Sequence, residues 1–328
     1  MIRQMQDSFN LENICYEKAH IDEVVAEIRS NFDKWFKKFL NSQNGYVPLD
    51  EIVEKAAEKI SISTLGGESS RSDNEKLEMI IAEAIKEYQK DQPKYQDIMD
   101  LDALEEYQEN PNAFKSTVLK NECPAIQKTL ANKKAKQLDK YRINFNAAKP
   151  TDLLNVVTKL CQFAENYVKN TYSRSAYEMV TDVADLKLDA LDTEDGYTAW
   201  GVIGGSIKTI LLYKIYPEQF PSRSQNALWA LWYLTEKKEF SCRYGSEFLM
   251  IDRDKVMTQQ NYFYPYHIFA YYAFVIYKML KGKAQSLGVD YDESYRYVLV
   301  NAFFDYIASV NEEEISLLKR TSGEWYDA

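Results

Sequence analysis

The chain has 328 residues, of which 45% are hydrophobic and 27% are charged, and its formal net charge is −10. This composition supports a sizeable core beneath a charged surface and excludes disorder of the whole chain. Apolar runs are short, since Ile210–Tyr213 already ends at Lys214, whereas a membrane span needs roughly 20 apolar residues. The residues after Met1 lack the apolar core of a signal peptide, so we expect a cytoplasmic protein without a membrane segment.

Apolar residues of the first third recur every three or four positions, which is the pattern of amphipathic helices. A Ser-, Gly- and Asp-rich stretch at 61–74 predicts an exposed loop, and Asn110–Asn112 predicts a turn around Pro111. The periodicity predicts helices over 17–40, 48–60, 75–90 and 95–107.

The next predicted helix, 124–142, lies in the most basic part of an otherwise acidic chain. Residues 115–149 contain nine Lys or Arg and two acids, a net charge of +7 that leaves −17 for the remainder. On a helical wheel the apolar residues of this helix occupy one half and most of its lysines the other. We expect a lysine face that contacts an acidic partner, nucleic acid included, because phosphate contacts release counterions. Its residues are Lys128, Lys133, Lys136, Lys140 and Arg142. A solvated face, or one docked on this protein's own acidic surface, is the alternative.

Residues 144–150 form a predicted hinge between an N-terminal helical region, 1–145, and a larger domain, 150–328. This second part holds 19 of the 25 tyrosines and four of the five tryptophans, which predicts the packing centre there. The segment around Arg243–Ser246 predicts one short hairpin between 240 and 252. Helices are predicted over 151–168, 175–186, 196–216, 224–235, 266–281, 291–310 and 313–320, so the fold class is predominantly all-α.

The densest aromatic run, 261–274, is bordered by polar side chains, and its tyrosines could stack on a planar ligand. Aromatic residues at helical spacing are more often core, where a buried histidine bonds a neighbouring tyrosine. The residues of this candidate pocket are Arg223, Asn226, Gln260, Asn261, Tyr264 and His267.

Metal-ligand spacing is lacking in the sequence. Cys15, Cys123, Cys161 and Cys242 contain no Cys-x-x-Cys pair, and the two histidines, His20 and His267, are separated by most of the chain. We therefore expect reduced thiols, no zinc site and no cofactor.

A glycine-rich segment, Gly201–Thr209, superficially resembles a phosphate-binding loop. Ile207 rather than glycine precedes Lys208, and no apolar strand leads into the segment. A closely packed helix explains it better than nucleotide binding does.

Two acidic groups support an alternative, enzymatic hypothesis, because carboxylates hold paired metal ions in hydrolases and nucleases. The first group is Asp182, Asp185, Asp189 and Asp192, and the second is Glu247, Asp252 and Asp254. A solvated helix face and an acidic loop would give the same pattern. The leading prediction is a non-enzymatic binding protein that acts through the lysine face. The alternatives are a metal-dependent hydrolase or nuclease and a structural subunit of a complex, with homo-oligomers open in each case.

Overall fold

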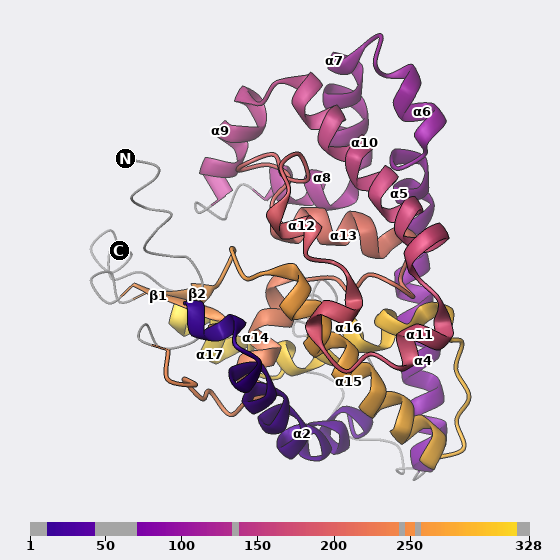
Figure 1. Cartoon of the computed structure of the whole chain (residues 1–328), viewed down its shortest axis with the longest axis vertical. Helices are drawn as coiled ribbons and strands as arrows, with labels where there is room; N and C mark the ends of the chain where they lie inside the picture. The colour runs from indigo at the N-terminus through magenta and orange to yellow at the C-terminus, as the bar shows by residue number, and fades with distance from the viewer. Residues whose placement is uncertain (1–11, 43–70, 133–137, 243–246, 253–256, 320–328) are drawn as a thin grey trace, which may run out of the picture.

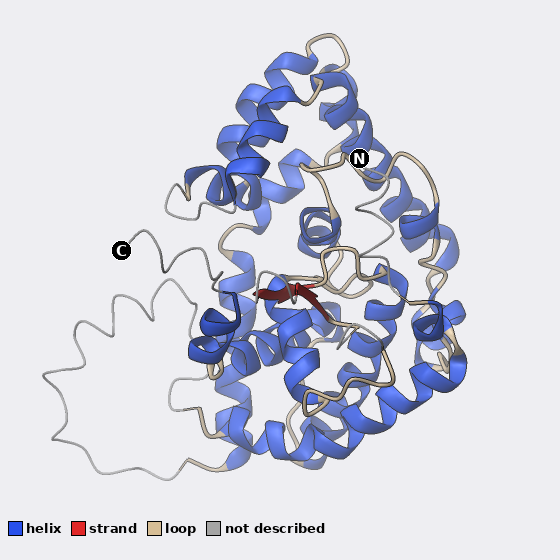
Figure 2. Ribbon diagram, turned by 90° about the vertical axis from the view of Figure 1, so that its left-hand side faces the viewer, coloured by secondary structure: helices blue, strands red, loops and turns tan. Residues whose placement is uncertain are grey.

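The computed structural model describes residues 12–42, 71–132, 138–242, 247–252 and 257–319. Helices make up most of these ranges, and the two named strands form one small antiparallel sheet, so the predicted all-α class with one hairpin is confirmed (Figures 1 and 2). None of the described helices combines the length and apolarity that a bilayer crossing demands.

The elements before residue 150 are mostly short helices. They are η1 (Asn13–Tyr16), α2 (Lys18–Leu40), α4 (Asp73–Gln89), α5 (Gln92–Ile98), α6 (Leu101–Glu106), α7 (Pro111–Ala113), the π-helical η2 (Phe114–Glu122), α8 (Pro124–Ala131) and α9 (Asp139–Ala147).

The later elements include the longest apolar helix. They are α10 (Pro150–Asn166), η4 (Tyr167–Thr171), α11 (Arg174–Glu178), η5 (Val183–Leu186), α12 (Ala190–Thr193), α13 (Gly205–Ile215), α14 (Gln225–Leu234), β1 (Leu249–Asp252), β2 (Met257–Gln260), α15 (Tyr266–Ser286), η6 (Glu293–Tyr295), α16 (Arg296–Ser309) and α17 (Glu312–Lys319).

The N-terminal helix α2 packs against α14, α15 and α16, which come from the last third of the chain. Its buried stripe repeats every three or four residues, and Phe32 and Phe39 both contact Phe303, with ring centroids 5.6 and 5.3 Å apart. Figure 1 places α2 and α4 beside these C-terminal helices at one end of the molecule. The predicted division into 1–145 and 150–328 stays a prediction, but contacts cross it.

Helices α5 to α10 gather at the opposite end in Figure 1. The amphipathic helix α10 contacts α6, α7 and η2, and its buried residues include Leu153, Leu154 and Leu160. Helix α13 packs on this group through its contacts with α5, α8 and α10, and Leu211 and Leu212 are fully buried. The carbonyl of its residue Lys214 accepts a hydrogen bond from Tyr88 of α4 at 2.8 Å, which joins α13 to the other end.

The predicted continuous helix over 124–142 is wrong. Helix α8 ends at Ala131, where Asn132 leaves the helical region with ψ at 77°, and α9 begins at Asp139. Asn readily leaves the helix because its side chain competes for backbone hydrogen bonds. Of the described basic residues, Lys128 therefore belongs to one helix, and Lys140 and Arg142 belong to another.

Two other predicted helices are interrupted by local capping. The helix expected over 95–107 is divided into α5 and α6, because Asp100 accepts a hydrogen bond from the Ala103 amide at 2.8 Å and caps α6. The helix expected over 175–186 is reduced to α11 and η5, and Lys187 ends η5 in the left-handed region at φ 53°.

The predicted hairpin exists with a different partner strand. Strand β1 pairs with β2, and Leu249 lies opposite Gln260. The residues near Phe240 were expected to form the partner strand, but the φ of Phe240 is 48°, which is not an extended conformation. Helix 48–60, most of the loop 61–74, and the turn 243–246 lie outside the described residues.

Arg296 organises the junction of α11, α15 and α16. It is fully buried, and its guanidinium carbon lies 4.4 and 4.5 Å from the ring centroids of Tyr177 and Tyr277. Next to it, Glu178 accepts hydrogen bonds from Tyr277, Lys278 and Lys281 at 3.0 to 3.1 Å. Burial alone would raise the pKa of Glu178, but these donors lower it from 4.5 to about 2.

This pKa predicts a specific acid sensitivity. The folded pKa lies below the unfolded one, so ionised Glu178 stabilises the fold above about pH 4.5, and this contribution is lost as the pH falls through about 2. We expect Glu178→Gln to flatten the decline of the unfolding free energy over that window, as measured by urea denaturation at several pH values. Glu165→Gln, in an exposed pair with Lys169, serves as the control. An unchanged slope for Glu178→Gln would contradict the assignment.

The close approach of Arg223 to α13 predicts that Gly205 cannot be replaced. A Cβ at Gly205 would lie 1.2 Å from Arg223 Nη2, whereas a Cβ at Gly204 meets nothing within 4 Å. Arg223 is buried and donates to the carbonyls of Tyr264 (2.6 Å) and Tyr262 (3.1 Å), so displacing it breaks charged hydrogen bonds. We expect Gly205→Ala to cost about 2 kcal/mol or more and Gly204→Ala about 0.5–1 kcal/mol, because Gly204 is the N-cap of α13 and glycine is a better N-cap than alanine. Equal urea midpoints for the two variants would refute this account.

Candidate metal centre

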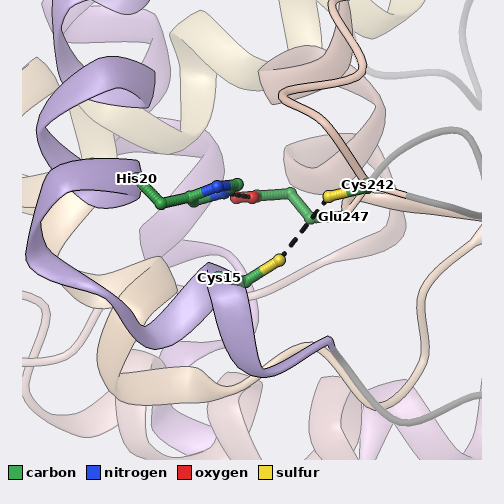
Figure 3. Close-up of side chains that lie close together, drawn as sticks. All are labelled: Cys15, His20, Cys242 and Glu247. Carbon is green, nitrogen blue, oxygen red and sulfur yellow. Dashed lines mark hydrogen bonds and ion pairs between the residues drawn. The ribbon is translucent and has the colours of Figure 1, made fainter.

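Four metal-ligating side chains converge beside the start of α2: Cys15, His20, Cys242 and Glu247. Two sulfurs, an imidazole nitrogen and a carboxylate oxygen all lie within 4.8 Å of one another, and all four residues are buried (Figure 3). Within the described ranges, no other group of three or more His, Cys, Asp or Glu side chains comes together in this way.

The N-terminal part of the chain supplies two of the four residues, and the segment between α14 and β1 supplies the other two. Cys15 lies in η1 and His20 in the first turn of α2, and the extended backbone of Glu17 joins these helices (φ −74°, ψ 136°). Cys242 and Glu247 lie just before β1 and approach from the opposite side in Figure 3. Cys15 and Cys242, like His20 and Glu247, are 227 residues apart in sequence.

The distance between the two sulfurs suits a tetrahedral ion. The Sγ atoms of Cys15 and Cys242 are 3.6 Å apart, well beyond the roughly 2.05 Å of a disulfide bond. Two thiolates bound to tetrahedral zinc at about 2.3 Å would lie roughly 3.8 Å apart. His20 Nε2 and Glu247 Oε2 are in direct hydrogen-bond contact, closer than the roughly 3.3 Å between two such ligands of one zinc ion, so these two side chains must move apart to bind it.

The electrostatics of the cluster favour a cation. Burial alone would lower the pKa of His20, but the hydrogen bond and charge of Glu247 raise it. The hydrogen bond between the two sulfurs lowers the pKa of Cys242 and raises that of Cys15. A bound cation would replace the remaining protons, because zinc ligands must be deprotonated.

Glu247 is held by residues that follow β2. Its Oε1 accepts a hydrogen bond from Tyr264 at 2.7 Å, and its backbone carbonyl accepts one from Asn261 Nδ2 at 3.1 Å. Asn261 is fixed in turn, since its Oδ1 accepts from the Phe263 amide at 3.0 Å. Such partners orient a ligating carboxylate and are typical of metal centres.

The residues of the candidate pocket predicted around the aromatic run are buried or half-buried hydrogen-bond partners. Arg223 binds two backbone carbonyls, Asn226 donates to Asp305 at 2.8 Å, and Gln260 accepts from Trp229 Nε1 at 3.4 Å. Tyr264 and Asn261 hold Glu247, and His267 bonds to Asp192. The structure therefore brings two of the six residues to the metal-ligand cluster.

The lysine face is only partly described. Lys133 and Lys136 lie outside the described residues, and Lys128 and Lys140 are exposed on α8 and α9 respectively. Arg142 donates to the Asn132 carbonyl at 3.0 Å and forms an ion pair with Asp139. Binding of an acidic partner by these residues stays a prediction.

The two acidic groups serve different purposes in the structure. The carboxylates of Asp182 and Asp185 accept backbone amide hydrogen bonds that cap η5, while Asp192 accepts from His267. Of the second group, Glu247 joins the four-residue cluster, whereas the side chains of Asp252 and Asp254 lie outside the described residues.

The expectation of no zinc site rested on the sequence separation of the cysteines and histidines. That premise is wrong for Cys15, His20 and Cys242, because folding brings them together across 227 residues. Linear spacing holds no signal for such a site. The one indication was Glu247, which had been grouped with acids that could bind metal.

Comparison of the chain with protein-family models, with curated proteins and with solved structures finds no significant match. The evidence for function therefore comes from the chain's own geometry.

The contact between Tyr264 and Glu247 can be tested by a single hydroxyl deletion. Tyr264→Phe removes the donor to a buried carboxylate oxygen, and we expect it to lower the unfolding free energy by about 1–3 kcal/mol. Tyr262→Phe is the matched control, because Tyr262 is 41% exposed and donates to the amide oxygen of Gln259 rather than to a buried carboxylate. Chemical denaturation of both variants provides the comparison, and equal losses would argue against a special role for Tyr264.

Proposed function

We propose that the chain binds one zinc ion through Cys15, His20, Cys242 and Glu247, and that this ion is a structural element of the fold. The observation that carries the proposal is the convergence of four buried ligand atoms within 4.8 Å of one another. Two thiolates, one imidazole and one carboxylate are ligands that zinc accepts in tetrahedral geometry.

The charges of such a centre nearly balance. Two thiolates and one carboxylate oppose the two positive charges of the ion, and the Tyr264 hydroxyl donates to the carboxylate. Glu247 is 2% exposed and Cys15 is fully buried, so both would be costly as isolated anions. Zinc offsets that cost at the position where the ligand atoms meet.

The closed set of ligands supports a structural rather than a catalytic role. Catalytic zinc sites keep three protein ligands and leave a fourth position for water or substrate. Here four protein ligands converge, and the most exposed of them, Cys242, is 8% accessible. The ion would join η1 and α2 to the segment before β1.

Such an ion contributes directly to folding, because the unfolded chain has no preformed site and binding free energy then becomes folding free energy. It would close a very long loop between ligands 227 residues apart in the chain. The expected cytoplasmic location suits the site, since a reducing compartment keeps both thiols available. Partner binding through the lysine face is compatible with this role and is a separate hypothesis.

Metal analysis tests the proposal directly. We expect the purified chain to hold about one zinc per molecule and to lose it, together with thermal stability, on treatment with a strong chelator. Zinc content by elemental mass spectrometry and the unfolding midpoint by calorimetry are the measurements. Substitution of cobalt for zinc should give the absorption of thiolate-bound tetrahedral cobalt.

Paired cysteine variants supply the control. Cys15→Ala and Cys242→Ala should each lose the metal, whereas Cys161→Ala, which removes a buried thiol that donates to the Met99 carbonyl, should retain it. A folded chain that takes up neither zinc nor cobalt, or one whose metal content survives both ligand variants, would overturn the proposal.

A further inference from the structure

A pocket of about 360 Å³ lies beside the metal-ligand cluster and is not part of it. One wall comes from the segment that carries Cys15 and His20, through Tyr16, Lys18 and Ile21. The other wall comes from the loops around η5 and α12 and from the start of α15. A pocket of this size fits a small molecule.

His267 presents a hydrogen-bond acceptor to the pocket. Its ring Nδ1 lies 2.7 Å from Asp192 Oδ2, and its backbone amide donates to the same oxygen at 2.9 Å. Burial alone would raise the pKa of Asp192, but the hydrogen bonds from His267 lower it, so Asp192 is ionised and accepts the Nδ1 proton. In the neutral ring, a proton on Nδ1 that is donated to Asp192 leaves the lone pair on Nε2.

The charged groups of the pocket leave one carboxylate uncompensated. Asp182 is satisfied by Lys18 at 3.1 Å and by the Ala184 amide at 3.2 Å. Asp189 lines the pocket, and its carboxylate has neither an ion pair nor a hydrogen bond within the described part of the chain. A ligand there meets more acceptors than donors.

Aromatic faces complete the site. The Tyr16 ring stacks on His267 with centroids 6.2 Å apart and an interplanar angle of 29°, and Tyr16 is 49% exposed. Tyr271 lines the opposite side, and its hydroxyl is already engaged with the Thr181 carbonyl at 2.7 Å. Phenol rings beside a carboxylate are a favourable environment for an organic cation.

We propose that this pocket binds a small molecule with a protonated amine, whose ammonium group donates to Asp189 and to His267 Nε2 and lies against the Tyr16 ring. A neutral or anionic analogue of the same shape leaves Asp189 unpaired or repels it. The pocket is thus selective for charge as well as for size.

Three probes of matched shape test the proposal: benzylamine, benzyl alcohol and benzoate. We expect saturation-transfer NMR and calorimetry at pH 7 to show binding of benzylamine, with the alcohol at least about tenfold weaker and benzoate unbound, because the charged hydrogen bonds are lost. Asp189→Asn and His267→Gln should each weaken benzylamine by roughly tenfold. Asp195→Asn, an exposed aspartate that does not line the pocket, should bind as the original chain does.

The variants are compared in the zinc-loaded chain, with metal content and unfolding midpoint recorded for each. Loss of benzylamine binding at normal metal content assigns the effect to the pocket alone. Equal affinities for amine and alcohol, or an Asp189→Asn variant that still binds benzylamine normally, would overturn the proposal. A chain that binds benzylamine but no metal would retain this inference and remove the zinc site.

Discussion

The buried carboxylate of Glu247 is the constraint that fixes how α2 is placed against the segment before β1. Glu247 is 2% exposed, and leaving it ionised in the interior is costly unless its oxygens are compensated. The compensation comes from distant segments, since His20 contacts one oxygen and Tyr264 donates to the other. The position of α2 is therefore tied to the segment before β1 by charge as well as by apolar packing.

This tie has consequences for how the chain folds. Helix α2 buries its apolar stripe against α14, α15 and α16, so its final position requires the last third of the chain. Contacts between residues so far apart carry a large loop-closure entropy and form late unless other contacts bring the segments together. The aromatic helix α15 and its neighbour α16 can supply that template, because most of their residues are buried against one another.

Periodicity was sufficient to predict most helices, and it failed where local capping decides the boundary. The buried stripe of α2 extends over several turns, and α14 and α15 are apolar on most sides, so all three helices follow from burial alone. The break at Asp100 depends on one side-chain hydrogen bond, and the break at Asn132 depends on one backbone angle. The hairpin was predicted close to its observed position, but sequence spacing did not specify that β1 pairs with β2.

The candidate metal centre could be predicted from the sequence even less well than the helix boundaries. Tyr264 and Asn261 were predicted as part of a ligand pocket beside the aromatic run, and in the structure both hold Glu247. Cys15, His20 and Cys242 carried no such signal, since each is an ordinary buried residue in its own segment. Their relation is purely tertiary and exists only in the folded chain.

The two proposed sites share one short segment. Cys15 faces the ligand cluster while its neighbour Tyr16 stacks on His267, so a shift of η1 moves both groups. Linkage requires that, if metal binding favours one position of η1, a pocket ligand that favours the same position strengthens metal binding by an equal factor. By the same rule, a pocket ligand that favours a different position of η1 weakens metal binding, and a ligand that leaves η1 in place has no effect on it.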